Sequence, residues 1–434
     1  MDPYRVLILL AIVYIMIAVM INPYDYNIFK NWVQVYREAG LSSIYAAWPS
    51  YGDEYRIVYP PLSPVVFISS YKAAVYLSSL AGYGGKVHIA VERIVVKSPI
   101  IAALIIHAVL LMRVYRDYRY PLALLAGPPV ILVVAAYDFE PIMMLLAFSA
   151  ILMHSRGRHF SSGVLLGLST LFKPVTAVLL PYITVTAYKD RGAGAAIRFI
   201  MSYTLVIAII CAPFIYHSGL DSLLNSVALY HASRHVQGPT PLLLAVDAVT
   251  PRLASMLPLV VVLAATLVVY RLLKPASLEG HLAAASIMMI VVLLSGKVVN
   301  PVYMYWVYAL AAPVMVSRGY FAKFFIVSGL ALLAVGLWYS LPLTVSAVLD
   351  KPYYDEETGK FMDPEEVDRI INDTFIAVDI SDSTLTMSPG VRDLVVGVAE
   401  HNVHMRYFLI TLYTAAIIIM LGLIARAWSD DDTL

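Results

Sequence analysis

Several charged side chains stand inside or directly beside long apolar runs of this chain. Asp25 follows the first run, and Lys173 interrupts a later one between Phe172 and Pro174. A carboxylate can take a proton from a hydroxyl group, and an ammonium or guanidinium group can hold an anion. Because charges that face a cavity inside a membrane are expensive and usually functional, we take these residues as candidates for a site. The further candidates are Tyr59, Asp138, Glu140, His231, Arg234, His235 and Lys297.

Composition indicates which elements must position these residues. Of the 434 residues 60% are hydrophobic and 14% charged, whereas soluble domains carry about 25% charged residues. Apolar runs recur along the chain, each near the roughly 20 residues that cross a bilayer as a helix. The sequence therefore predicts an all-α polytopic membrane protein. Its net charge of +1 suggests no nucleic-acid partner, and the single cysteine, Cys211, excludes an intrachain disulfide and a cysteine metal cluster.

The basic residues orient the helices. Short connectors rich in Lys and Arg mark the cytoplasmic side of a membrane. All such connectors of this chain fall on that one side if the stretch 60–112 crosses the membrane a single time in total. Which of its two segments, 60–81 or 98–112, spans stays open. We expect about 12 crossings, a retained first helix and cytoplasmic termini, in a plasma membrane or an endoplasmic-reticulum-type membrane. The apolar segments are 4–21, 60–81, 98–112, 121–137, 141–153, 160–172, 174–188, 196–216, 254–270, 279–296, 302–317, 324–346 and 406–425.

The first outer loop carries Asp25 at the start of an amphipathic pattern. Apolar residues from Ile28 to Tyr36 follow helical spacing, polar residues occupy the other face, and Gly40 ends the run. This pattern predicts a juxtamembrane helix lying at the membrane interface. By spacing alone, Asp25 is suited to capping that helix. The step Tyr59-Pro60-Pro61-Leu62 then fixes the backbone before the next apolar segment.

The late polar stretch 347–405 predicts a small outer subdomain. Helix-start signals occur at Asp363-Pro364 and at Ser388-Pro389, and the segment 374–380 has strand character. The expected domains are therefore a transmembrane module over 1–346, this extracytoplasmic subdomain over 347–405, and a last transmembrane helix with an acidic cytoplasmic tail over 406–434.

Five short stretches in fixed order resemble the GT-C superfamily of integral-membrane glycosyltransferases. An acid after the first helix, followed by an amphipathic helix and a "YPPL" step, is the first of these. The others are "YDFEP" (137–141), "GLSTLFKPVTAVLLP" (167–181), "YHASRHVQGPTPL" (230–242) and "SGKVVNPVYMYW" (295–306). They look most similar to transferases that use dolichyl- or polyprenyl-phosphate mannose or glucose. The tryptophan-rich W-W-D signature of oligosaccharyltransferases and a D-x-D pair in the first loop are absent.

The resemblance implies a GT-C-like fold and an inverting transfer of a hexose. The donor would be a polyprenyl-phosphate sugar, and the acceptor a hydroxyl of a lipid-linked molecule or a glycan on the extracytoplasmic face. Asp25 would be the catalytic base. The donor phosphate would be held by Arg234, Lys173, Lys297 and Tyr59. Sugar or acceptor hydroxyls would contact Asp138, Glu140, His231 and His235.

Each assignment has a structural alternative. Lys173 and Lys297 could simply extend to the membrane interface, Tyr59 could be an interface anchor, and the acids and histidines could belong to solvated turns. His231 and His235 have the i, i+4 spacing of a metal pair, but no third ligand is evident, so no metal and no cofactor is expected. Two other functions stay open: a flippase or transporter of lipid-linked sugars, and an inactive assembly subunit.

Overall fold

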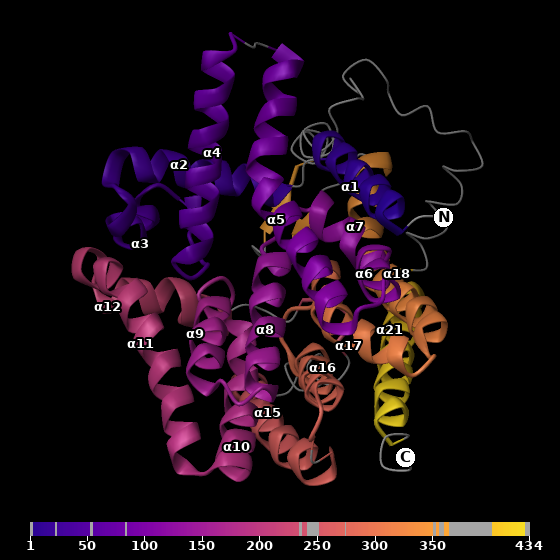
Figure 1. Ribbon diagram of the computed structural model, residues 1–434. Helices are drawn as coiled ribbons and strands as arrows, with labels where there is room; N and C mark the ends of the chain where they lie inside the picture. The colour runs from indigo at the N-terminus through magenta and orange to yellow at the C-terminus, as the bar shows by residue number, and fades with distance from the viewer. Residues whose placement is uncertain are drawn as a thin grey trace.

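We analysed a computed structural model of the chain, which is built almost entirely of helices (Figure 1). It describes the backbone of residues 3–21, 24–52, 55–82, 85–233, 237–240, 251–273, 275–349, 353–355, 360–363 and 402–429. Its longer helices are α1 (Pro3–Met20), α2 (Tyr24–Ala39), α4 (Leu62–Leu80), α5 (Gly85–Tyr115), α6 (Arg119–Leu125), α7 (Pro128–Ala135), α8 (Glu140–Ser155), α9 (His159–Thr170), α10 (Leu179–Arg191), α11 (Ala193–Ser218), α15 (Pro251–Leu273), α16 (Leu278–Ser295), α17 (Met304–Ser317), α18 (Phe321–Leu349) and α21 (Asn402–Ser429).

Short elements complete the described part of the chain. After α2 come η1 (Leu41–Ser43), α3 (Ile44–Ala47) and η2 (Trp48–Ser50), and η4 (Pro174–Val178) precedes α10. After α11 come α12 (Leu220–Leu224), η5 (Asn225–Leu229) and α13 (Tyr230–Ser233), and η6 (Pro301–Tyr303) precedes α17. Two strands, β1 (Tyr353–Asp355) and β2 (Lys360–Met362), pair antiparallel.

An all-α membrane protein is confirmed by the lengths and compositions of these helices. Within the described residues, five helices are long and apolar enough to cross a bilayer: Val87–Tyr115, Ala193–Ser218, Leu278–Ser295, Phe321–Ser340 and Met405–Ser429. Other apolar helices, among them α8, are shorter. The expected number of about 12 crossings and the side on which each terminus lies stay predictions.

The stretch 60–112 folds differently from its expected segments. α5 is one continuous helix that begins at Gly85 and contains Pro99, so the charged residues before position 98 lie within it rather than in a connector. α4 and the first part of α5 project side by side from the other helices (Figure 1). Of the two, α5 and not α4 has the length and composition of a membrane-crossing helix.

Two apolar segments are broken where the sequence places proline. The expected segment 121–137 divides into α6 and α7 because Gly127 is extended and Pro128 begins the next helix. A Cβ at Gly127 would also collide with the ring of Tyr308. The predicted break at Lys173-Pro174 is confirmed: Lys173 is extended, with φ −144° and ψ 133°, and Pro174 begins η4. The residue before a proline is sterically biased toward this conformation.

The core is formed by helices that are apolar on all sides. Every residue of α17 from Met304 to Met315 is buried, and α16 is buried nearly as fully. Such helices belong inside a bundle. α9 approaches α11 closely at Gly163 and Gly167, where the backbone and side chains of α11 occupy the space that a Cβ would need.

The predicted amphipathic helix of the first outer loop is present as α2, and Gly40 ends it with φ +80°. Its apolar face packs against protein, and its position at the membrane interface stays a prediction. Phe29, Trp32 and Val35 are at most 3% exposed, because they pack against aromatic residues of α4 and of the loops beside it. The helix is therefore fixed to the protein.

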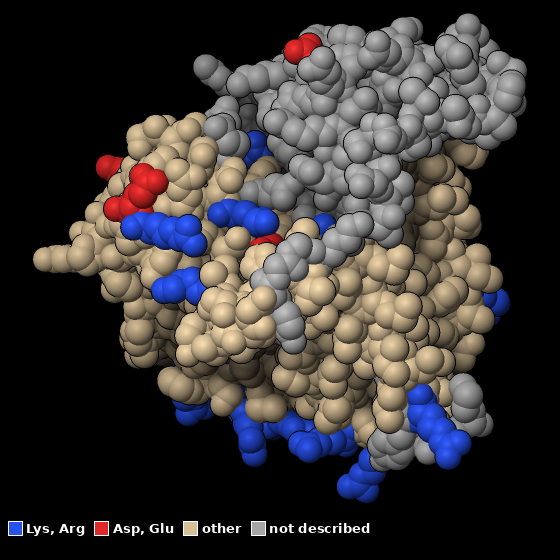
Figure 2. Space-filling model, turned by 90° about the horizontal axis from the view of Figure 1, so that it is seen from above, with Lys and Arg blue, Asp and Glu red and all other residues tan. Residues whose placement is uncertain are grey.

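One end of the bundle collects the ends of several helices. The rings of His154 in α8 and His281 in α16 have centroids 4.8 Å apart, and Trp428 of α21 packs against the first turn of α16. The guanidinium of Arg426 lies over the ring of Tyr320, just before α18. Several of the basic connectors that the sequence assigns to one side of a membrane therefore share one end. Figure 2, a view of the molecule from above, shows one group of Lys and Arg side chains along the lower edge, a second group beside acidic side chains at the left, and a broad area without charged side chains.

Of the predicted outer subdomain, the structure describes the short hairpin of β1 and β2. α18 extends to Leu349 before it. The helices expected at Pro364 and Pro389, and the strand at 374–380, lie outside the described residues.

Candidate functional site

Lys173 lies between two carboxylates at the end of the bundle where α8 begins. Its Nζ donates to Oδ1 of Asp138 at 2.7 Å and also to Oε1 of Glu140. Asp138 stands in the turn after α7, Glu140 is the first residue of α8, and Lys173 stands in the break between α9 and η4. All three residues are at least 94% buried. The chain breaks at proline thus bring three charges together inside the protein.

Two tyrosine rings flank the same ammonium. Nζ of Lys173 lies 5.3 Å from the ring centroid of Tyr59 and 5.1 Å from that of Tyr303, within range of a cation–π attraction. Burial by itself disfavours the ammonium, but the negative charges of Asp138 and Glu140 outweigh it and raise the pKa of Lys173 well above its usual value. Lys173 is therefore a fixed cation.

The carboxyl groups of this triad outnumber its ammonium group. Burial and the negative charge of Asp138 raise the pKa of Glu140 well above its usual value, and Oε2 of Glu140 is buried without a hydrogen-bond partner in the described part of the chain. Buried polar atoms are rarely left unpaired. Oε2 of Glu140 is therefore suited to form a hydrogen bond with a bound hydroxyl group.

An aromatic cluster connects the triad to α2. The ring centroid of Phe29 lies 5.6 Å from that of Tyr59 and 5.8 Å from that of Phe139. The ring of Tyr26 lies 5.8 Å from that of Tyr137, the residue before Asp138. The first two turns of α2 are therefore held against the loop that carries the triad's aspartate.

Asp25 belongs to the first turn of α2, directly before Tyr26. The ring of the next residue, Tyr26, lies 5.8 Å from that of Tyr137, while the side chain of Asp25 lies outside what the structure describes. Its role as a base stays a prediction, as does the alternative role as a helix cap.

Lys97 is a functional candidate that sequence reasoning missed. It is fully buried in α5, and its Nζ donates to the backbone oxygens of Ile21 at 2.6 Å and Ala135 at 2.9 Å. One amino group thus joins the end of α1, just before Asp25, to the end of α7, just before the triad. Charged residues at positions 92, 93 and 97, in a helix otherwise apolar around them, were the available signal.

Glu92, on the same helix, contacts two residues of α2. Its Oε1 accepts from the hydroxyl of Tyr26 at 3.1 Å and pairs with Nζ of Lys30 at 3.0 Å. Glu92 is 5% exposed. α5 therefore contacts the segment that contains Asp25 through two side chains, those of Glu92 and Lys97.

The predicted histidine loop reaches the same region. Nε2 of His231 lies 2.9 Å from the backbone oxygen of Val58, beside Tyr59. Since a carbonyl oxygen only accepts, Nε2 must carry the proton. Further along, the backbone N–H of Gln237 donates to the oxygen of Lys297 at 2.7 Å, so the loop joins the turn before α17. Arg234 and His235 lie outside the described residues.

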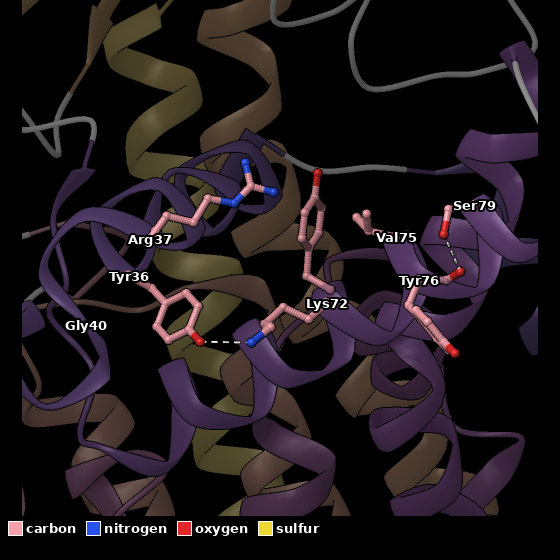
Figure 3. Close-up of a pocket in the computed structure, with 8 residues that line it drawn as sticks. Tyr36, Arg37, Gly40, Lys72, Val75, Tyr76 and Ser79 are labelled. Atoms are coloured by element: carbon pink, nitrogen blue, oxygen red, sulfur yellow. Dashed lines mark hydrogen bonds between the residues drawn. The ribbon is translucent and has the colours of Figure 1, made fainter.

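An open groove of about 690 Å³ lies between α2 and α4 (Figure 3). Nζ of Lys72, from α4, donates to the hydroxyl of Tyr36, from α2, at 2.8 Å. Arg37 lies beside Tyr36 on the α2 side of the groove. Tyr71, which also lines it, stacks on Phe67 of the aromatic cluster. The groove thus presents two cations and several phenol rings next to the candidate site. It is lined by Tyr36, Arg37, Gly40, Tyr71, Lys72, Val75, Tyr76 and Ser79.

The structure brings together four of the predicted site residues: Tyr59, Asp138, Glu140 and Lys173. His231 is attached beside Tyr59, and the backbone of Lys297 is joined to the histidine loop. The cation-binding tyrosine Tyr303 was not singled out from the sequence, although it lies in the stretch 295–306.

Comparison of the chain with models of protein families found no family that matches, and comparison with curated proteins found no similar sequence. The resemblance to the GT-C superfamily stays a prediction.

Proposed function

We propose that this protein is an inverting glycosyltransferase that moves a hexose from a polyprenyl-phosphate donor to an acceptor hydroxyl at the extracytoplasmic face. One observation supports it most: stretches singled out by the resemblance, far apart in the sequence, meet around Lys173. These are the start of α2, the Tyr59 step, the Asp138 turn and the lysine-proline break, with Tyr303 from the stretch before α17.

In the proposed reaction Asp25 takes the proton of the acceptor hydroxyl as its oxygen bonds to the anomeric carbon. The bond from that carbon to the phosphate oxygen breaks, and the phosphate leaves with the electron pair. Attack opposite the leaving group inverts the configuration. A positioned carboxylate base typically contributes about 10²- to 10⁴-fold.

Among the proposed phosphate ligands, the geometry ranks Lys173 last. Its ammonium already binds two carboxylates, whereas a leaving phosphate needs a cation that is available to it. Arg234 and Lys297 stay proposed phosphate ligands, and Tyr59 lies at the triad's edge. Asp138 and Glu140 are better suited to binding sugar or acceptor hydroxyls, because Oε2 of Glu140 has no hydrogen-bond partner among the described residues.

The groove between α2 and α4 suits the approach of an anionic lipid head. Arg37 and Lys72 are exposed cations there, and the tyrosine rings around them fit the depth of the membrane interface. We propose that it receives the phosphate of the polyprenyl carrier before or after transfer.

The proposal is tested by purified protein given a panel of radiolabelled polyprenyl-phosphate sugars. We expect transfer by the wild type, a loss of about 10²- to 10⁴-fold in Asp25→Asn, and little change in the control Glu38→Gln at the exposed far end of α2. Unchanged transfer by Asp25→Asn removes Asp25 as the base.

Two other functions give different results. A flippase would move a labelled lipid-linked sugar across sealed vesicles without transferring it. An inactive assembly subunit would do neither. Absence of transfer from every donor by the wild type overturns the enzymatic proposal.

A further inference from the structure

Three histidines and one aspartate converge at the end of α8 that lies away from the triad. His154 ends α8, His159 begins α9, Asp190 ends α10, and His281 lies in the first turn of α16. From Glu140 to His154 the helix rises about 1.5 Å per residue, which is about 21 Å in all. This cluster is therefore separate from the candidate active site.

The ligating atoms of the cluster lie close together. One ring nitrogen or carboxylate oxygen from each of His154, Asp190 and His281 lies within 4.8 Å of the others. The ring of His159 has its centroid 5.2 Å from that of His154. Ligands bound to one zinc ion at about 2.0–2.2 Å are at most about 4 Å apart. A small closing movement would bring His154, Asp190 and His281 into contact with one ion.

The hydrogen bonds around His154 leave a lone pair available for an ion. The hydroxyl of Thr186 lies 3.0 and 3.1 Å from the backbone oxygens of Tyr182 and Ile183, so its proton is used there. Its oxygen must then accept from Nε2 of His154, 2.9 Å away. In the neutral ring, Nδ1 is consequently unprotonated, and it is buried without a partner among the described residues.

His281 and His159 add to this arrangement. Nδ1 of His281 lies 2.8 Å from the hydroxyl of Tyr182, an outer contact of the kind that orients metal-binding histidines. Both ring nitrogens of His159, a residue 4% exposed, lack hydrogen-bond partners in the described chain. Buried imidazole nitrogens without partners need an explanation, and a metal ion gives one.

We propose that His154, His281 and Asp190 bind a divalent transition-metal ion of the zinc type, with His159 as the fourth ligand. Imidazole and carboxylate ligands suit such ions. Asp190 is exposed, so the ion can enter from that side. Bound there, it cross-links α8, α9, α10 and α16.

Two guanidinium groups oppose this binding. Arg191 acts electrostatically on both Asp190 and His159, and Arg198 acts on His159. A cation placed among these residues is repelled by both guanidinium groups, so Arg191→Gln should bind metal more tightly than the wild type.

The test uses the full-length purified protein, treated with a chelator and titrated with Co²⁺ as an optical probe, followed by competition with Zn²⁺. We expect one Co²⁺ per chain, displaced by Zn²⁺. Affinity should fall at least about tenfold in His154→Asn and His281→Asn, as losses of even outer-shell partners do. The exposed His217→Asn on α11 is the matched control and should bind as the wild type does.

Asp190→Asn separates loss of a metal ligand from unfolding of the protein, because this side chain is exposed and its replacement leaves the core intact. It should weaken Co²⁺ binding while its unfolding temperature in chelator equals that of the wild type. No stoichiometric Co²⁺ binding by the wild type, or equal binding by His154→Asn and Asp190→Asn, overturns the proposal. Neither result depends on sugar transfer.

Discussion

Nζ of Lys173 lies 2.7 Å from Oδ1 of Asp138, although the two residues are 35 positions apart. Each stands where a helix is interrupted, Lys173 before Pro174 and Asp138 in the turn before α8. The interruptions leave both side chains on irregular backbone inside the bundle. At the candidate site this irregular backbone, enclosed by protein, carries the charges.

Lys173→Met should be strongly destabilising. Removing the cation leaves two carboxylates buried together, and loss of one partner of a buried ion pair costs about 3–5 kcal/mol. Thermal unfolding in detergent measures this, and Lys189→Met, exposed at the end of α10, should leave the unfolding temperature unchanged. Glu140→Gln keeps one balanced pair and should cost far less. Equal losses in both triad variants would contradict the excess of carboxyl groups described for the triad.

The stability given by Lys173 should persist to alkaline pH. Burial disfavours its ammonium, but Asp138 and Glu140 hold the pKa of Lys173 above its usual value of about 10.4. A raised folded-state pKa gives stability that is complete below the ordinary value and is lost as pH rises through the folded one. The difference in unfolding temperature between wild type and Lys173→Met should therefore stay constant from about pH 7 to about pH 10. A difference that narrows already near pH 8 counts against this pairing.

Lys97→Met should slow sugar transfer more than it weakens donor binding. Lys97 joins the backbone before Asp25 to the end of α7, so its loss lets the base move relative to the triad. A displacement of about 1 Å can lower a rate about 10²-fold. Measuring kcat and KM separately tests this. Lys323→Met, an exposed lysine near the start of α18, is the control, and a change in KM alone would argue against a positioning role.

Arg37→Gln and Lys72→Gln should weaken binding of polyprenyl phosphate in detergent or nanodiscs. A basic residue near an anionic lipid surface contributes about 1 kcal/mol, so each change should weaken binding about fivefold. Arg198→Gln, on α11, is a control of the same type. Binding that is unaffected by both groove variants would separate the groove from the lipid phosphate.

Gly163→Ala should destabilise the contact of α9 with α11. The added Cβ meets the backbone oxygen of Phe199 and the hydroxyl of Ser202, so the helices must separate. Overpacking of this kind typically costs about 1–3 kcal/mol. Gly194→Ala, near the start of α11, meets nothing within 4 Å and serves as the control. Equal unfolding temperatures for the two variants would show that the contact is looser than described.

The sequence by itself determined the helices and their interruptions. Hydrophobicity over about 20 residues is a local property, so most apolar segments became helices close to their predicted ends. Proline acts on its neighbour's backbone, so the break at Lys173 was also predictable. The family resemblance singled out Tyr59, Asp138, Glu140 and Lys173, and the structure places these four residues together.

Only the tertiary structure decided what those side chains contact. The partners of Lys173, the double contact of Lys97 and the cluster around His154 join residues from helices far apart in the chain. The apolar face of α2 likewise packs against the protein, because aromatic side chains of other elements cover it. The burial and the hydrogen-bond partners of a charged group or an imidazole depend on residues that tertiary packing brings next to it. Those residues are distant in the chain, so the local sequence does not identify them.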